Sequence, residues 1–376
     1  MKLLSTVPQD ASVVAVFEPE MLPENGGNGE LGKTILKIFG SDAVNKDIAV
    51  SFVYNDRVYI TGLVSDQGAF RKLVGDKSTG ETFISGNVAQ QGDCFWIRLD
   101  GGNVSSGDID TFLSITEEES FAGKVDVDRL TSGDSDIAFM ADVRSILENM
   151  DISCSDQVMM GLSVLFNDAA WVAGDINIDR QKLDFTLSVL DSKCKDAEWL
   201  FPAGKIDTSV FRYLKQGNVL MAIALPKELV DRIADLAVTA GAGGMMRMFK
   251  GVDGTAAFSF CQGMSDVSGV ITASTPAAAT DLEKGMTMFA GGMKTSVDDK
   301  YFIFSGIEDT PFSMKDVSDL DGALFGIMAR NTGNSSGNDL QDIRVMVKND
   351  GKRLAITGTC CFANGSDIWK NILNLL

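Results

Sequence analysis

The sequence contains no histidine, and this absence closes off a large part of enzyme chemistry. Imidazole is the most frequent general base in catalysis and the commonest metal ligand. Every triad or dyad that relays a proton through imidazole is therefore excluded. Zinc and haem sites that depend on histidine ligands are excluded as well.

Positive charge is scarce. The chain has 33 Lys and Arg against 52 Asp and Glu, which gives a formal net charge of −19. Proteins bind nucleic acid by neutralising its phosphates with Lys and Arg. The composition therefore argues against nucleic acid as a partner.

Cysteines at metal-binding spacing and long apolar runs are also missing. The six cysteines include no C-x-x-C spacing, which argues against a thiolate zinc site and favours isolated, mostly buried thiols. No apolar run approaches the ~18 residues that a membrane-spanning helix needs. Pro8, Gln9 and Asp10 interrupt the opening before the apolar core of a secretory signal could form. We expect either that the protein is made without a signal or that its signal has been removed.

What remains is an ordinary globular composition. Apolar residues make up 45 % of the 376 residues and charged residues 23 %, which predicts a folded chain long enough for two domains. Four short apolar segments predict strands, and the first three run into a helix start. These segments are 12–17, 136–141, 218–224 and 322–328. Pro19 and Pro226 suit the first position of the helices that follow.

Downstream of each segment lies an acidic turn between two apolar runs. The four turns are Asn55-Asp56, Asn167-Asp168, Asp253-Gly254 and Asn349-Asp350-Gly351. Asn, Asp and Gly tolerate the positive φ that tight hairpins require, so each turn predicts a β-hairpin. Asp66 and Asp367 are predicted helix caps.

Short turns between strands favour an antiparallel arrangement. We therefore predict an α+β fold in which repeated strand-helix-hairpin units form large, mainly antiparallel sheets with helices packed on them. The units divide the chain into an N-terminal half, 1–205, and a C-terminal half, 206–376. The sequence leaves open whether the two halves form one continuous domain.

The segment from Gly27 to Thr34 matches the P-loop pattern G-x-x-x-x-G-K-T. In a P-loop, backbone N–H groups cradle phosphates, the lysine reaches the terminal phosphates and the threonine binds Mg²⁺. Gly27, Gly32, Lys33 and Thr34 would take these roles here. A nucleotide-binding protein is therefore one alternative function.

The context of this motif favours a surface loop. A P-loop directly follows a buried strand of a parallel sheet, whereas a stretch with two prolines and three glutamates separates Gly27 from the predicted strand. The hairpins predict antiparallel strands instead. We accordingly expect no cofactor and no catalytic or metal site.

Carboxylates offer a second alternative. Asp126 with Asp128, and Asp175 with Asp179, alternate along predicted strands, and paired carboxylates are the machinery of glycoside hydrolysis. A carboxylate-dependent hydrolase acting on envelope glycans therefore stays open. The acidic stretch from Asp108 to Glu119 lacks the ligand spacing of an EF-hand and reads as a solvated surface.

The phrase Val7-Pro8-Gln9-Asp10-Ala11-Ser12-Val13-Val14 resembles the opening of a family of uncharacterised envelope proteins of Bacteroides and relatives, many of them predicted lipoproteins. The stretch Leu354–Gly358 and the closing helix are similar too. The resemblance implies an extracytoplasmic protein whose signal and lipid anchor lie outside the given chain, and it brings no catalytic residues. If Met1 is the native start, a cytoplasmic location is expected instead.

These observations lead to one hypothesis. The protein is expected to be a non-catalytic binding or structural protein of the cell envelope, in the periplasm or at the cell surface. Its partner is an unknown protein or glycan, held on a sheet surface or between the halves.

Overall fold

A computed structural model describes most of the chain. The described residues are 3–22, 30–75, 82–124, 128–131, 135–149, 159, 161–163, 165–239, 247–261, 266–287, 293–307, 311–313, 317–330, 340–350, 352–363 and 368. The chain divides into two compact units. Unit 1 comprises Met1–Glu198 and Asn364–Leu376, and unit 2 comprises Trp199–Ala363.

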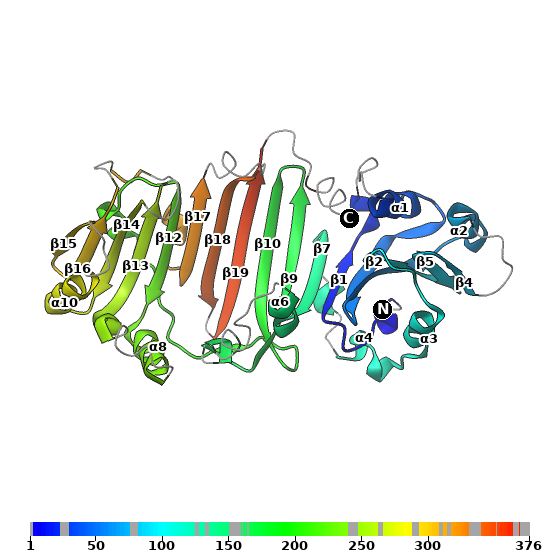
Figure 1. The fold of residues 1–376 in the computed structure, drawn as a ribbon, viewed down its shortest axis with the longest axis horizontal. Coiled ribbons are helices and arrows are strands. Elements are labelled where there is room, and N and C mark those ends of the chain that lie inside the picture. Colours follow the sequence, from blue (N-terminus) through cyan, green and yellow to red (C-terminus); the bar gives the residue numbers. More distant parts are fainter. Residues whose placement is uncertain are drawn as a thin grey trace. The chain divides into compact units, whose positions relative to one another are not determined.

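Unit 1 is built on an antiparallel sheet with the strand order β10-β9-β7-β1-β2-β3-β6-β5-β4 (Figure 1). The strands are β1 (Val13–Phe17), β2 (Val44–Tyr54), β3 (Arg57–Val64), β4 (Thr82–Ser85), β5 (Val88–Gln91), β6 (Cys94–Arg98), β7 (Ile137–Asp142), β9 (Ala169–Asp179) and β10 (Lys182–Asp191). Short β8 (Phe166–Asn167) precedes β9, and β11 (Glu198–Trp199) stands where the two units meet in the sequence.

Helices cover both faces of this sheet. On one face, Ile35, Ile38 and Phe39 of α1 and Phe70 of α2 pack on a core that includes Phe95. The opposite face carries η1, α3, α4 and α5. The helices of unit 1 are η1 (Leu4–Thr6), η2 (Pro19–Met21), α1 (Glu30–Phe39), α2 (Gln67–Val74), α3 (Ser106–Ser114), η3 (Glu117–Glu119), α4 (Phe121–Lys124), α5 (Asp128–Thr131) and α6 (Val143–Asn149).

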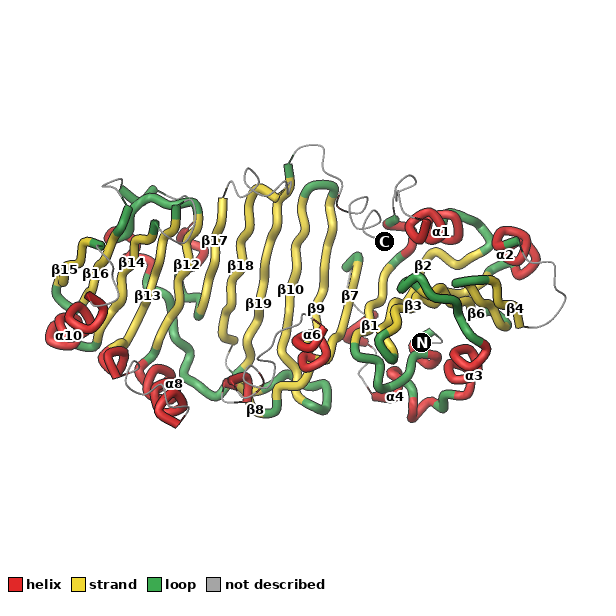
Figure 2. The backbone as a smooth tube through the Cα atoms, viewed as in Figure 1, coloured by secondary structure: helices red, strands yellow, loops and turns green. Residues whose placement is uncertain are grey.

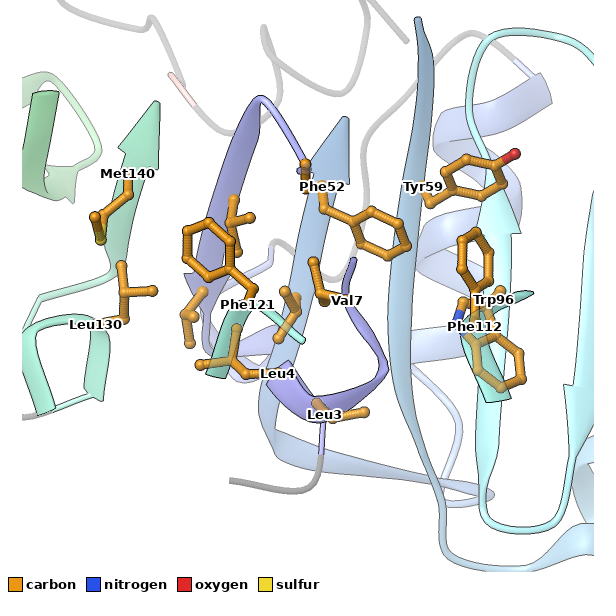
Figure 3. Packing of buried hydrophobic residues seen from close by; sticks show 14 of the residues in the cluster. Leu3, Leu4, Val7, Phe52, Tyr59, Trp96, Phe112, Phe121, Leu130 and Met140 are labelled. Atoms are coloured by element: carbon orange, nitrogen blue, oxygen red, sulfur yellow. The ribbon is translucent and has the colours of Figure 1, made fainter. Parts of the chain in front are cut away.

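An aromatic cluster forms the core beneath α3. The ring of Phe112 lies 5.3 Å from that of Phe52, 5.1 Å from Tyr59 and 6.1 Å from Trp96, measured between centroids (Figure 3). All four side chains are buried. Edge-to-face and offset stacking of this kind adds to the hydrophobic contribution of the buried rings.

Unit 2 has its own antiparallel sheet, with the strand order β19-β18-β17-β12-β13-β14-β16-β15 (Figure 2). Its strands are β12 (Val219–Leu225), β13 (Val252–Phe260), β14 (Val267–Ala273), β15 (Lys294–Asp298), β16 (Tyr301–Ser305), β17 (Phe325–Arg330), β18 (Leu340–Asp350) and β19 (Arg353–Phe362). Its helices are η4 (Thr208–Tyr213), α8 (Lys227–Thr239), η5 (Arg247–Gly251), α10 (Pro276–Thr287) and η6 (Val317–Leu320).

The sheets of the two units share a strand order. If β1 is matched with β12, β2 with β13, β3 with β14, β6 with β16, β7 with β17, β9 with β18 and β10 with β19, neighbouring strands correspond throughout. The hydrogen bonds beside the central strands correspond as well. Asp142 N donates to Ser12 O at 2.7 Å, and Arg330 N donates to Asn218 O at 2.8 Å.

Large antiparallel sheets with packed helices confirm the α+β class, but not every predicted hairpin forms. The first turn closes β2 onto β3 with positive φ at Asn55 (49°) and Asp56 (57°), and the fourth joins β18 to β19. Asp168 closes no hairpin, because β9 pairs with β10 and β7 instead.

The third predicted turn is also wrong. Asp253 and Gly254 lie inside β13, where the pairing with β14 shifts register. Gly254 takes its positive φ of 130° within a β-bulge rather than in a reverse turn. The four predicted repeats thus differ at their turns. Pro19 occupies the first position of a helix as predicted, although η2 has only three residues, whereas Pro226 directly precedes α8 instead of occupying its first position.

Candidate functional site

The P-loop-like residues lie at the start of α1. Lys33 is exposed, Thr34 is half-buried and Gly32 is buried, all within the first turns of that helix, while Gly27 lies outside the described residues. The preceding strand, β1, is antiparallel to both of its neighbours, β2 and β7. A nucleotide-binding P-loop follows a strand of a parallel sheet, so this strand arrangement differs from that of a phosphate site.

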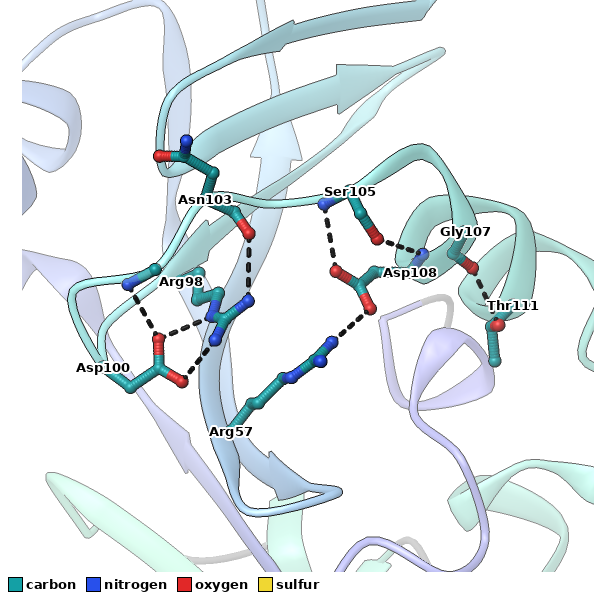
Figure 4. Close-up of polar contacts among 9 residues, drawn as sticks. Arg57, Arg98, Asp100, Asn103, Ser105, Gly107, Asp108 and Thr111 are labelled. Carbon is teal, nitrogen blue, oxygen red and sulfur yellow. Dashed lines mark hydrogen bonds and ion pairs between the residues drawn. The ribbon is translucent and has the colours of Figure 1, made fainter.

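The acidic stretch between β6 and η3 provides helix caps. Asp108 accepts from Ser105 N at 3.0 Å while Ser105 Oγ accepts from Asp108 N at 3.1 Å, which forms the capping box of α3 (Figure 4). Arg57 Nη1 donates to the same carboxylate at 3.0 Å and joins the β2–β3 turn to α3. Glu119 caps η3 in the same way by accepting from Thr116. Those two hydrogen bonds lower the pKa of Glu119.

A second ion pair fixes the loop after β6. Asp100 accepts from Arg98 at Nε (2.5 Å) and Nη2 (2.9 Å), and Gly102 N donates to it at 3.0 Å (Figure 4). The hydrogen bonds from Arg98 hold the pKa of Asp100 below its ordinary value, although partial burial opposes the shift. Asp100, Asp108 and Glu119 therefore form local hydrogen bonds and ion pairs that hold helix ends and a loop.

The paired carboxylates are not arranged for hydrolysis. Asp175 and Asp179 point to the same face of β9, but four residues of strand separate them by ~13 Å, beyond the ~5–9.5 Å between the acids of a glycosidase. Asp128 begins helix α5 rather than continuing a strand, and Asp126 lies outside the described residues. Within the described ranges, no cluster of three or more Cys, Asp or Glu residues is placed to hold a metal ion.

The thiols are isolated from one another. Cys94 and Cys194 are buried, and Cys261, Cys360 and Cys361 are half-buried. Burial raises the pKa of Cys194, which disfavours the reactive thiolate.

The most distinctive surface of unit 1 is one face of β7, β9 and β10. The register places apolar side chains opposite one another across all three strands: Ile176 pairs with both Ile137 and Phe185, and Val172 pairs with Val189. We call this set the unit 1 apolar face, and its members are all half-buried. They are Ile137, Phe139, Val172, Ile176, Leu183, Phe185, Leu187 and Val189.

Gly174 lies in the middle of this face. A Cβ there would stand 2.5 Å from Leu187 Cδ2 and 3.1 Å from the ring of Phe139, so the missing side chain lets these two groups close over the strand. The other face of the β9–β10 hairpin carries the polar residues Asp175, Asn177, Asp179, Lys182, Asp184, Thr186 and Ser188 and, further along the strands, the buried core residues Trp171, Ala173 and Leu190. Over the polar part of the hairpin, the apolar side chains therefore lie on the face that keeps contact with solvent.

Unit 2 has a corresponding surface on β12, β17, β18 and β19. In its register, Met221 pairs with Ile327, Ile327 with Val345, and Val347 with both Phe325 and Ile356. We call this set the unit 2 apolar face. Its half-buried members are Val219, Met221, Phe325, Ile327, Ile343, Val345, Val347 and Ile356.

The sequence carries a local signal for these faces. Segments 172–178 and 183–189 alternate apolar and polar residues, which is typical of strands with one polar face. The prediction of a sheet-surface site was made without naming residues. Local alternation does not show which strands stand side by side, and so it cannot reveal a continuous face.

None of the helices in the described part of the chain is long and apolar enough to span a lipid bilayer. No protein-family model matches the chain, and no curated protein matches it. Among solved structures, the chain is similar to crystal form I of TP0453, at 13 % identity and a TM-score of 0.32, over 50 % of this chain and 78 % of that one. Crystal form III of TP0453 gives 14 % identity and a TM-score of 0.30, over 54 % and 83 % of the two chains.

Proposed function

We propose that the protein is a non-catalytic, extracytoplasmic binding protein of the cell envelope whose ligand is an acyl chain. The observation that carries this proposal is the unit 1 apolar face, a set of half-buried aliphatic and aromatic side chains in continuous register. Soluble proteins rarely keep contiguous apolar surface in contact with water unless it binds something. The unit 2 apolar face supports the same function.

The backbone beneath these faces favours an acyl chain over a peptide. Strands β7, β9, β12, β17 and β18 each pair with a strand on both sides, so their ladder hydrogen bonds are used within the sheet. A peptide laid across such a face would lose water from its N–H and C=O groups without gaining partners, at a cost of about 1–3 kcal/mol for each buried group. An acyl chain has no such groups.

Charge and sequence resemblance support the rest of the proposal. A net charge of −19 opposes docking on an anionic membrane surface. The terminal phrases that resemble the Bacteroides envelope family support an extracytoplasmic location. Cell fractionation of the native organism tests that location, and recovery in the cytoplasm would contradict it.

A fluorescent fatty acid titrated into the protein tests the ligand class. We expect saturable binding that Leu187→Gln weakens by about tenfold or more, since burying a leucine side chain is worth about 1.5–3 kcal/mol. The matched control is Thr186→Gln, which adds the same side chain on the polar face of the same strand. This control should bind like the wild type.

Circular dichroism shows whether each variant is folded. If Leu187→Gln does not fold, Ile176→Gln on the neighbouring strand takes its place. An equal loss of fatty-acid affinity in Leu187→Gln and in the control Thr186→Gln would contradict the proposal. So would the absence of fatty-acid binding by the wild type, or binding of an apolar peptide or a glycan in its stead.

A further inference from the structure

A pocket in unit 1 lies apart from the two apolar faces. It has a volume of about 240 Å³ and is enclosed by η2, the last turn of α1 and the start of β2. The residues that line it are Pro19, Glu20, Leu22, Leu36, Phe39, Gly40 and Lys46. In Figure 1, α1 lies above β2.

The size and walls of the pocket suit the apolar body of a small molecule. An engineered apolar cavity of about 150 Å³ binds benzene, so a pocket of this volume has room for a ring with a short substituent. Leu22, Leu36, Phe39 and Pro19 supply the apolar surface. The ring of Phe39 is held by edge-on contact with Phe17, at 6.1 Å between centroids.

The two charged residues on the wall are not equivalent. Lys46 Nζ stands 3.2 Å from Oδ1 of Asp42, four residues earlier in the chain, so Lys46 already has a carboxylate partner. Glu20 is exposed and makes no hydrogen bond or ion pair with another described residue. The unbalanced charge in this pocket is therefore negative.

Two further features favour the same sign of ligand charge. The last turn of α1 lines the pocket, and the carbonyl end of a helix attracts cations. The net charge of −19 draws cations toward the molecule as a whole. The neighbouring Lys46 is the positively charged residue of the wall, and it already has Asp42 as a partner.

We propose that this pocket binds a small organic cation, an ammonium group carried on a compact apolar body. The apolar part lies against Leu36 and Phe39, and the ammonium is directed to the carboxylate of Glu20. This site is independent of the acyl-binding function, because it uses none of the residues of either apolar face.

Three probes of one shape test the sign of the charge. Isothermal titration calorimetry would compare 3-phenylpropylamine with 3-phenylpropanol and 3-phenylpropionate at pH 7. We expect the amine to bind most tightly and the carboxylate most weakly. Equal affinity of the amine and the carboxylate, or tighter binding of the carboxylate, would overturn the proposal.

Two pairs of variants locate the site. Glu20→Gln should weaken binding of the amine by about two- to fivefold, as for other exposed ion pairs, and leave the alcohol unchanged. Its control is Glu18→Gln, a neighbouring exposed carboxylate outside the pocket wall. Both carboxylates are exposed, so both variants should remain folded.

Leu36→Trp should fill the pocket and abolish binding of both amine and alcohol. Lys37→Trp, which places the same bulk on an exposed position of α1 outside the wall, should not. Equal effects within either pair of variants, or the absence of amine binding by the wild type, would refute the site.

Discussion

Two buried polar atoms reduce the stability of the core of unit 1. Thr61 Oγ1 and Trp96 Nε1 are buried without a hydrogen-bond partner, and the two residues face each other between β3 and β6. A buried polar atom that lacks a partner costs roughly 1–3 kcal/mol, because it has given up its hydrogen bond to water. This core therefore carries polar groups that reduce its stability.

Replacing this threonine with its apolar isostere should stabilise the protein. We expect Thr61→Val to raise the free energy of unfolding by about 1 kcal/mol, since it removes the unpaired hydroxyl and keeps the volume. Urea denaturation measures the change. Thr61→Ser keeps the hydroxyl and loses the methyl group, so it should lower stability. A less stable Val variant would show that the hydroxyl has a partner.

Asp100 makes stability depend on pH in the acidic range. The hydrogen bonds from Arg98 lower the pKa of Asp100 in the folded state below its unfolded value of 3.8. A carboxyl group with a depressed pKa contributes stability above its unfolded pKa, and that stability is lost as the pH falls through the folded pKa. The stability contributed by the Arg98–Asp100 ion pair is therefore lost as the pH falls below about 4.

Asp100→Asn should accordingly lower the free energy of unfolding by about 1 kcal/mol at pH 7, as expected for a partly exposed ion pair. The difference from the wild type should shrink toward pH 2. Denaturation at a series of pH values measures this trend. Glu118→Gln, at an exposed carboxylate of the same region, is the control and should show little effect at any pH. A deficit in Asp100→Asn that is constant with pH would contradict the linkage.

At the scale of single elements, α1 shows how one sequence pattern can fit two structures. Gly32, Lys33 and Thr34 match the end of a P-loop and, as a P-loop requires, lie in the first turns of a helix, whose buried face packs on the sheet through Ile35 and Ile38. The P-loop pattern specifies only the residue types of one short segment. The direction of the neighbouring strands, which a phosphate site also requires, is set by distant segments.

The nucleotide hypothesis has a direct test at this element. We expect Mg-ATP and Mg-GTP to leave the melting temperature of the wild type and of Lys33→Ala unchanged, because β1 is antiparallel to both of its neighbours. Differential scanning fluorimetry measures the shift. A rise with nucleotide in the wild type alone, absent in Lys33→Ala, would restore the P-loop.

At the scale of the whole molecule, the most informative feature is the strand order that the two units share. Strands that correspond in this order are also buried in the same pattern. Half-buried and buried residues follow the same order along β7 and β17. Each unit therefore presents an apolar face on its own copy of the same strands. The two faces predict two ligands for each chain.

This prediction rests on the proposed acyl-binding function. Titration of the fluorescent fatty acid at high protein concentration should give two bound probes per chain for the wild type. Leu187→Gln on the unit 1 apolar face and Val345→Gln on the unit 2 apolar face should each reduce the number to one, and the double variant should bind none. A single site in the wild type would contradict the equivalence of the two faces without refuting acyl binding itself.

The sequence by itself determined the local elements. A short continuous apolar run predicted the first strand over 12–17, and β1 spans Val13–Phe17. Asn55-Asp56 specified a tight turn, and Asp66 caps α2 by accepting from Ala69 N at 2.9 Å. Each of these depends on the conformational preferences and hydrogen bonds of residues only a few positions apart. Such interactions are visible in any short window of sequence.

Only the tertiary structure decided which segments meet. It directed Asp253-Gly254 into a bulge, joined Arg57 to Asp108 across 51 residues, and aligned β7, β9 and β10 into a continuous apolar face. The physical reason is that strand pairing and burial are cooperative over the whole unit. A residue's partner is set by the register of strands far away in the chain, and local preference yields to it.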